Sequence, residues 1–180
     1  MNPNEKAELA RELFLSGSNC AQSVYAAFAD EMGMSRERAL LLSSGMGGGI
    51  GGLRFTCGAF LAMAMVMSAL RGYTDGADMD GKKRLYAQVQ RLHERFVEKY
   101  GTSVCRELLE KNGISVSHVP SERTPEYYKK RHCAQYVAFC AELVAEELEK
   151  NSIFALLRQG FFLIVRSMPV PENESGEVFS

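Results

Sequence analysis

The chain has 180 residues, of which 46% are hydrophobic and 24% charged, which is enough apolar material for one domain with a sizeable core. Its 21 basic and 22 acidic side chains leave a formal net charge of −1, so the surplus of Lys and Arg that nucleic acid attracts is absent and no nucleic-acid partner is expected. The N-terminus is polar rather than a signal peptide, so the five cysteines indicate reduced thiols in a cytoplasmic protein.

Hydrophobic residues recur with the helical period almost everywhere, and strand alternation is almost absent, which predicts an all-α fold. We expect a single-domain helical bundle of about six to seven helices within residues 1–150. The first three helices are predicted at Pro3–Leu15, from the Ser18-Asn19 cap to Gly33, and at Arg36–Ser44.

A glycine-rich segment, GMGGGIGG at residues 45–52, lies between the third and fourth predicted helices. It contains a formal GxGxxG, but a helix precedes it where a dinucleotide site requires a strand. The glycines instead indicate positive φ angles and a backbone that passes close to a bulky group, such as a cofactor or a substrate. Thr56 is expected to cap the fourth helix, whose apolar body predicts the buried centre of the bundle.

Three more helices are predicted at Lys82–Tyr100, from Thr102 or Ser103 to Lys111, and from Pro125 to about Lys150. Residues 151–180 should form an apolar segment followed by a loosely ordered tail. The apolar part, Ile153–Val165, is too short and too interrupted to span a membrane. It is typical of a core helix or of an interface helix, and a homodimer is one possibility.

Four cysteines lie at or near the starts of different predicted helices: Cys20, Cys57, Cys105 and Cys133. Free N–H groups at a helix start favour the thiolate, the form that binds metals or attacks disulfides. Cys133 is expected about two turns inside the helix that begins at Pro125. There, positively charged neighbours rather than a helix start would lower the pKa of its thiol. Cys140 lies in the middle of an apolar stripe and reads as a core residue.

The spacing of these cysteines excludes the common local motifs. The chain has no CxxC, so neither a thioredoxin-type pair nor a zinc ribbon is predicted. His93, His118 and His132 form no spaced metal motif either. An iron–sulfur cluster accepts ligands from distant segments because it requires thiolates rather than a fixed local spacing, although any single cysteine here could simply fill the core.

Several segments together carry a family resemblance: residues 17–24 (GSNCAQSV), the GMGGGIGG run, Cys57-Gly58-Ala59, Cys105 before RELL, and Cys133 ahead of an apolar helix. In this order they resemble the C_GCAxxG_C_C family, whose members are suspected to be redox-active. The chain departs from the family's central motif at Ala62, where the motif has glycine. The resemblance implies a small helical protein with a prosthetic group such as an iron–sulfur cluster.

The preferred prediction is that the four cysteines converge on one site and ligate an iron–sulfur cluster that exchanges electrons with a partner protein. The resemblance maps the ligands onto Cys20, Cys57, Cys105 and Cys133. Residues expected to approach the cofactor are Gly47, Gly48, Gly49, Arg54 and Gly58. Arg54 is a candidate for holding an anionic ligand or for compensating thiolate charge.

Two alternatives stay open from the sequence. In the first, the protein is a thiol–disulfide oxidoreductase in which two cysteines cycle without metal, with Cys57 as the nucleophile. In the second, the chain is an interaction module that zinc stabilises or that needs no metal. Whether the protein is an enzyme therefore depends on which of these three chemistries the cysteines perform.

Overall fold

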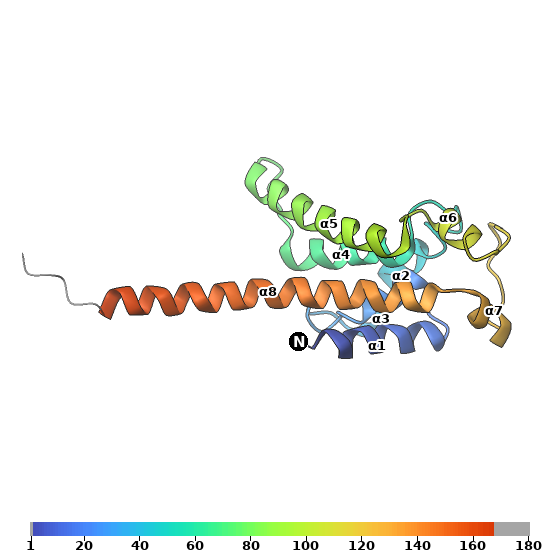
Figure 1. The fold of residues 1–180 in the computed structure, drawn as a ribbon, viewed down its shortest axis with the longest axis horizontal. Coiled ribbons are helices and arrows are strands. Elements are labelled where there is room, and N and C mark those ends of the chain that lie inside the picture. Colours follow the sequence, from blue (N-terminus) through green and yellow to red (C-terminus); the bar gives the residue numbers. More distant parts are fainter. Residues whose placement is uncertain (1, 168–180) are drawn as a thin grey trace, which may run out of the picture. The chain divides into compact units, whose positions relative to one another are not determined.

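The computed structural model describes residues 2–167, with side chains for residues 2–150, and within them the chain is helical (Figure 1). The predicted all-α class is confirmed, since this part of the chain contains eight α-helices, one short 3-10 helix and no strand. The elements are α1 (Pro3–Leu15), α2 (Cys20–Ala26), α3 (Arg36–Ser43), η1 (Ser44–Met46), α4 (Gly58–Arg71), α5 (Met79–Tyr100), α6 (Cys105–Glu110), α7 (Pro125–Lys130) and α8 (Cys133–Ser167).

The capping residues fix the helices that the sequence predicted best. Asn2 accepts from the Asn4 N–H at the start of α1, and Ser35 accepts from the Arg38 N–H at the start of α3. Gly101 ends α5 in the left-handed conformation at φ 83°, as expected of a glycine placed there. The first and third predicted helices are therefore confirmed to within one residue.

Several predicted boundaries are wrong. The helix predicted at Lys82–Tyr100 begins earlier, at Met79, because Asp78 caps it. The second predicted helix is shorter than expected: α2 ends at Ala26, and the chain from there to Gly33 forms turns. Thr56 does not cap α4, because Cys57 itself occupies the N-cap position. The last predicted helix is two helices, since Arg131 is extended at φ −103° and ψ 124°, which ends α7 before α8 begins.

Contacts within the chain define two compact units, residues 1–146 and 147–180. The predicted boundary at residue 150 and the predicted homodimer stay predictions. The backbone of the apolar segment Ile153–Val165 lies within α8, but its side chains and the predicted loose tail at 168–180 lie outside the described residues. Among the described residues, no helix is both long enough and apolar enough to cross a membrane. The features below all belong to the first unit.

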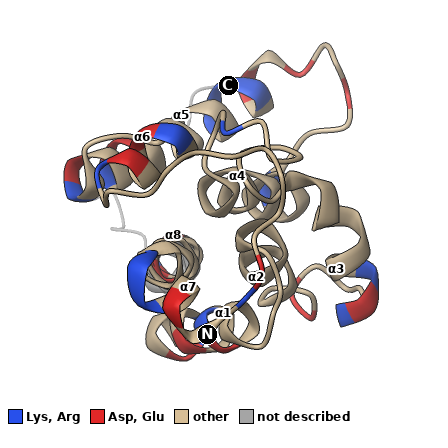
Figure 2. Cartoon of the chain, turned by 90° about the vertical axis from the view of Figure 1, so that its right-hand side faces the viewer, with Lys and Arg blue, Asp and Glu red and all other residues tan. Residues whose placement is uncertain are grey.

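The core of the first unit forms around α2 and α4. Helix α2 packs against α1, α3 and α4, and α5 lies beside α4 (Figure 1). One face of α4 is fully buried through Met63, Val66 and Met67. Charged residues lie instead along other helices, such as α3, α6 and α7, as the colours of the cartoon in Figure 2 show. The expectation of a buried, apolar fourth helix therefore holds for one face of α4.

An aromatic cluster joins α4 and α5 to the first turns of α8. The Phe96 ring lies 6.2 Å from the Phe60 ring and 6.1 Å from the Tyr136 ring, centroid to centroid. Tyr100 meets Tyr136 at 4.6 Å in an edge-on arrangement. Such pairs each add about 0.5–1.5 kcal/mol beyond the burial of their area. The cluster therefore fixes the start of α8 against α5.

We predict that Leu92→Ala on α5 lowers the free energy of unfolding by about 2–5 kcal/mol, because it leaves a cavity at a side chain that is only 1% exposed. The matched control is Leu41→Ala on α3, where the same change is made at a side chain that is 63% exposed. Urea unfolding followed by circular dichroism measures both variants. Equal losses of stability in the two variants would contradict the core described above.

Candidate functional site

All four cysteines of the predicted site lie at helix starts. Cys20, Cys105 and Cys133 are the first residues of α2, α6 and α8, and Cys57 is the N-cap of α4. The prediction that Cys133 lies two turns inside a helix is wrong, because the break at Arg131 and His132 makes it the first residue of a new helix. The four thiols thus share one type of backbone position.

A capping box fixes the position of Cys20. The Asn19 side chain accepts hydrogen bonds from the N–H groups of Ala21 and Gln22, both at 3.0 Å. The Gln22 side chain accepts in return from the Asn19 N–H at 3.0 Å. This reciprocal pair satisfies the free donors of the first turn and starts α2 at Cys20.

Backbone pairing between two distant segments brings Cys57 and Cys105 together. Thr56 and Val104 form an isolated antiparallel bridge. The Cys57 N–H donates to the Ser103 carbonyl at 2.8 Å, and the Cys105 N–H donates to the Phe55 carbonyl at 2.6 Å. Helices α4 and α6 therefore each start directly after one of these two paired segments. The side-chain caps predicted at Thr56 and at Thr102 or Ser103 are absent from these two described helix starts.

One pocket collects the four thiols. It has a volume of about 20 Å³ and is lined by Cys20, Cys57, Cys105, Leu108, Leu109, Cys133 and Tyr136. That volume admits about one water molecule, so a larger group needs the lining side chains to move apart. Cys140 does not line the pocket and is fully buried in the core, as the sequence indicated.

The apolar lining residues were not predicted as part of the site, although helical spacing points to them. Leu108 and Leu109 follow Cys105 by three and four positions, and Tyr136 follows Cys133 by three. Residues at these spacings lie on the same face of a helix. A search for apolar residues one turn after each cysteine would have found all three.

The predicted glycines divide between two places. A Cβ at Gly58 would lie 2.6 Å from the Cys20 sulfur, and one at Gly49 would lie 2.7 Å from the Cys105 Cβ. These two glycines therefore leave room for the cysteines. Gly47 and Gly48 instead line a second, larger cavity together with Arg54. The expected positive φ is confirmed at Gly48 and Gly49.

The prediction that the helix starts favour the thiolate is wrong for three of the cysteines. Burial is the main cause that raises the pKa of Cys57 and Cys105, and it raises the pKa of Cys133 to about 12. Charge on Cys20 raises all three pKa values further, since ionised thiols repel one another. At these three cysteines desolvation outweighs the helix dipole, and their thiols hold their protons at neutral pH.

Arg54 lies between the two cavities. It is 7% exposed, has a positive φ of 65°, and donates from Nε and Nη2 to the Ser117 carbonyl at 2.8 and 2.6 Å. Its charge and a hydrogen bond lower the pKa of Cys105, although less than desolvation and Cys20 raise it. Arg54 is therefore placed to compensate negative charge on Cys105.

The four cysteines do not form the kind of group that holds a single ion. Among the described residues, no three or more His, Cys, Asp or Glu side chains are grouped closely enough to hold one metal ion. His93 has a structural role instead, with its Nε2 2.9 Å from the Ser103 hydroxyl.

Comparison with known proteins gives one family. A family model described as "Putative redox-active protein (C_GCAxxG_C_C)" matches residues 18–147, which include all five cysteines. Neither the curated proteins nor the solved structures gave a match.

We predict that Gly58→Ala lowers the free energy of unfolding by about 1–3 kcal/mol, because its methyl group would meet the Cys20 sulfur at 2.6 Å and the Met46 carbonyl at 2.8 Å. Gly76→Ala is the matched control, since its Cβ meets nothing within 4 Å. That control should change stability by less than about 1 kcal/mol. Thermal and urea unfolding compare the two variants, and a neutral Gly58→Ala would speak against the close contact.

We also predict that the reduced, chelator-treated protein loses stability as the pH rises above about 9. The pKa of Cys133 is about 12 in the folded chain against an ordinary value of 9.0, so the unfolded chain releases this proton first. Unfolding then becomes more favourable by up to about 1.4 kcal/mol per pH unit for this group. Urea unfolding at pH 8, 9 and 10 measures the slope. Cys133→Ser should make it shallower, and an unchanged slope would contradict the burial of this thiol.

Proposed function

Since the chain belongs to the C_GCAxxG_C_C family of redox-active proteins, we propose that its four-cysteine pocket binds an iron–sulfur cluster and that the protein transfers electrons. The observation that carries this proposal is that Cys20, Cys57, Cys105 and Cys133 line one pocket. No other cysteine of the chain takes part, since Cys140 lies in the core.

The donor set fits such a group. Iron–sulfur clusters take four cysteine thiolates, and each thiolate can bind a different iron, so the four sulfurs need not meet at one ion. This property suits a pocket in which the described cysteines are not grouped around a single point. Three of the four come from segments that only the tertiary fold brings to Cys20.

Binding of a cluster in this pocket would be coupled to the release of protons from the thiols. Burial and mutual repulsion keep the thiols of Cys57, Cys105 and Cys133 protonated when nothing positive lies between them. Iron would supply that positive charge, and the thiols would release their protons on binding. Arg54 would add further compensation at Cys105.

The apolar side of the pocket suits electron transfer. Leu108, Leu109 and Tyr136 give the pocket an apolar wall beside Cys57, which is buried, while Cys20, Cys105 and Cys133 are partly exposed. The solvent exposure of a cluster is one of the factors that set its reduction potential. A bound cluster would supply one-electron chemistry, and the chain's own residues would position the four sulfurs.

A thiol–disulfide oxidoreductase has less support from the same observations. Attack on a disulfide requires a thiolate, and burial raises the pKa of Cys57, the expected nucleophile. The redox partner protein and the cytoplasmic location stay predictions from the sequence.

We predict that the protein purified without oxygen, or reconstituted with iron and sulfide, contains iron and shows visible absorption and an EPR signal on reduction or oxidation. Single serine variants at Cys20, Cys57, Cys105 and Cys133 should lose most of the bound iron, because each removes one of four thiolate ligands. Cys140→Ser is the matched control and should retain the iron, since this thiol lies outside the pocket.

Three results would count against this function. Protein that stays free of iron after reconstitution would exclude the cluster. Stoichiometric zinc in elemental analysis would favour the stabilising module instead. A defined, reversible disulfide among the four cysteines, found by mass mapping after mild oxidation of iron-free protein, would favour thiol–disulfide exchange.

A further inference from the structure

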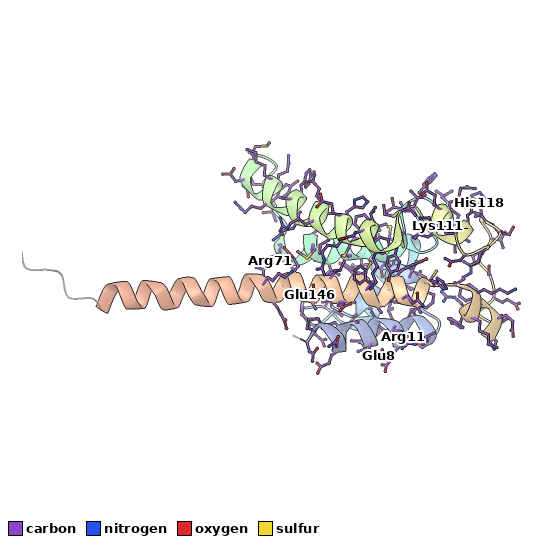
Figure 3. All side chains as sticks on the ribbon, viewed as in Figure 1. Glu8, Arg11, Arg71, Lys111, His118 and Glu146 are labelled. Atoms are coloured by element: carbon purple, nitrogen blue, oxygen red, sulfur yellow. The ribbon has the colours of Figure 1, made fainter. Side chains whose placement is uncertain are left out.

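A second cavity of about 350 Å³ lies beside the glycine-rich segment, and its size suits a small molecule. Gly47, Gly48 and Arg54 line it from one segment, while Arg123 and Arg131 line it from the α6–α7 loop and the end of α7. His118 also lines it, and Figure 3 shows this residue on the same loop. The cavity is distinct from the four-cysteine pocket, with which it shares no lining residue.

The cavity carries positive charge without a matching negative one. Three guanidinium groups line it, and its lining includes no Asp or Glu. Within the described part of the chain, none of these three arginines forms an ion pair. Glu122 and Glu126 line a neighbouring hollow that Arg131 shares, but neither pairs with it.

Arg123 provides a donor that the described part of the chain leaves unused. Its Nη1 is buried and has no hydrogen-bond partner among the described residues, while Nη2 donates to the Ser18 carbonyl at 3.1 Å. The guanidinium stacks on Phe14 at 4.7 Å and on Tyr127 at 4.8 Å, which fixes its position. A buried charged donor without an acceptor is costly, and Arg123 keeps such an unused donor within a side chain that lines the cavity.

Arg131 and Arg54 are also held in place by contacts with neutral groups. Arg131 lies 4.5 Å from the Tyr127 ring, so the two guanidinium groups of Arg123 and Arg131 share one aromatic support. Arg54 is fixed by the Ser117 carbonyl. Glycine at position 48 leaves room for this arginine, because a Cβ there would lie only 3.2 Å from Arg54 Nη1.

We propose that this cavity binds a small oxyanionic molecule, a carboxylate or a phosphate, held by Arg54, Arg123 and Arg131. The planar guanidinium fork matches the oxygens of both groups. Gly47 and Gly48 contribute backbone to the cavity wall, and the absence of a side chain leaves room for Asn19 beside Gly47 and for Arg54 beside Gly48. The proposal does not require a bound cluster, because the three arginines line this cavity and not the cysteine pocket, although Arg54 also lies beside Cys105.

Calorimetric titration of the full chain with orthophosphate, glycerol 3-phosphate and citrate, at constant ionic strength set with chloride, tests this site. We expect at least one of the three to bind at millimolar concentration or below. Glycerol 3-phosphate alone would indicate a phosphate ester, and citrate alone would indicate a carboxylate ligand. Iron content is measured on the same sample, so absence of the cluster and absence of the anion site are separate results.

Arg123→Gln and Arg131→Gln should each weaken binding about tenfold or more, since each removes a charged donor. Arg123→Lys keeps the charge but loses the fork, so it should weaken binding less. Arg84→Gln is the matched control, made at an exposed arginine on α5 outside the cavity, and should bind as the unmodified protein does. Circular dichroism checks that each variant is folded.

Two results would overturn the proposal. One is that none of the three oxyanions binds more strongly than chloride. The other is that folded Arg131→Gln binds them as tightly as Arg84→Gln does. The Arg131 variant decides the matter if Arg123→Gln fails to fold, because Arg123 also packs against Phe14 and Tyr127.

Discussion

The arrangement of the site depends on one short piece of backbone pairing, the antiparallel bridge between Thr56 and Val104. Its two flanking hydrogen bonds hold Cys57 and Cys105 at the ends of paired segments, and each segment turns at once into a helix. Because the pairing uses only main-chain groups, it does not depend on which side chains stand at these positions. It therefore acts as the frame to which α2 and α8 add the other two cysteines.

The pocket illustrates a competition between two electrostatic effects. Helix starts favour negative charge at sulfur, but removal from water and repulsion between sulfurs act in the opposite direction. Burial has the larger effect on the thiol pKa here, since the pKa of Cys133 is raised. The positive charges of Arg54, Arg123 and Arg131 lower the pKa values of nearby thiols only in part. The thiols of Cys57, Cys105 and Cys133 therefore hold their protons more tightly than free cysteines do, and a bound cation would oppose that effect.

The sequence predicts most of the helices because their signals are local. Asn2 and Ser35 cap the helices they precede, and Gly101 ends α5, as ordinary capping rules require. The break before Cys133 could not be predicted, since Arg131 and His132 are not helix-breaking residues. The bridge from Thr56 to Val104 joins segments far apart in the chain, and Arg123 reaches its cavity from a loop, so no local pattern indicates either.

Tyr136 belongs both to the aromatic cluster and to the lining of the cysteine pocket. Its ring also packs against Tyr100 of α5, so one side chain belongs to both environments. The chain contains seven tyrosines and no tryptophan, so tyrosine emission is not masked by indole fluorescence. Because Tyr136 lies next to the sulfurs, a coloured group held there would quench its share of that emission.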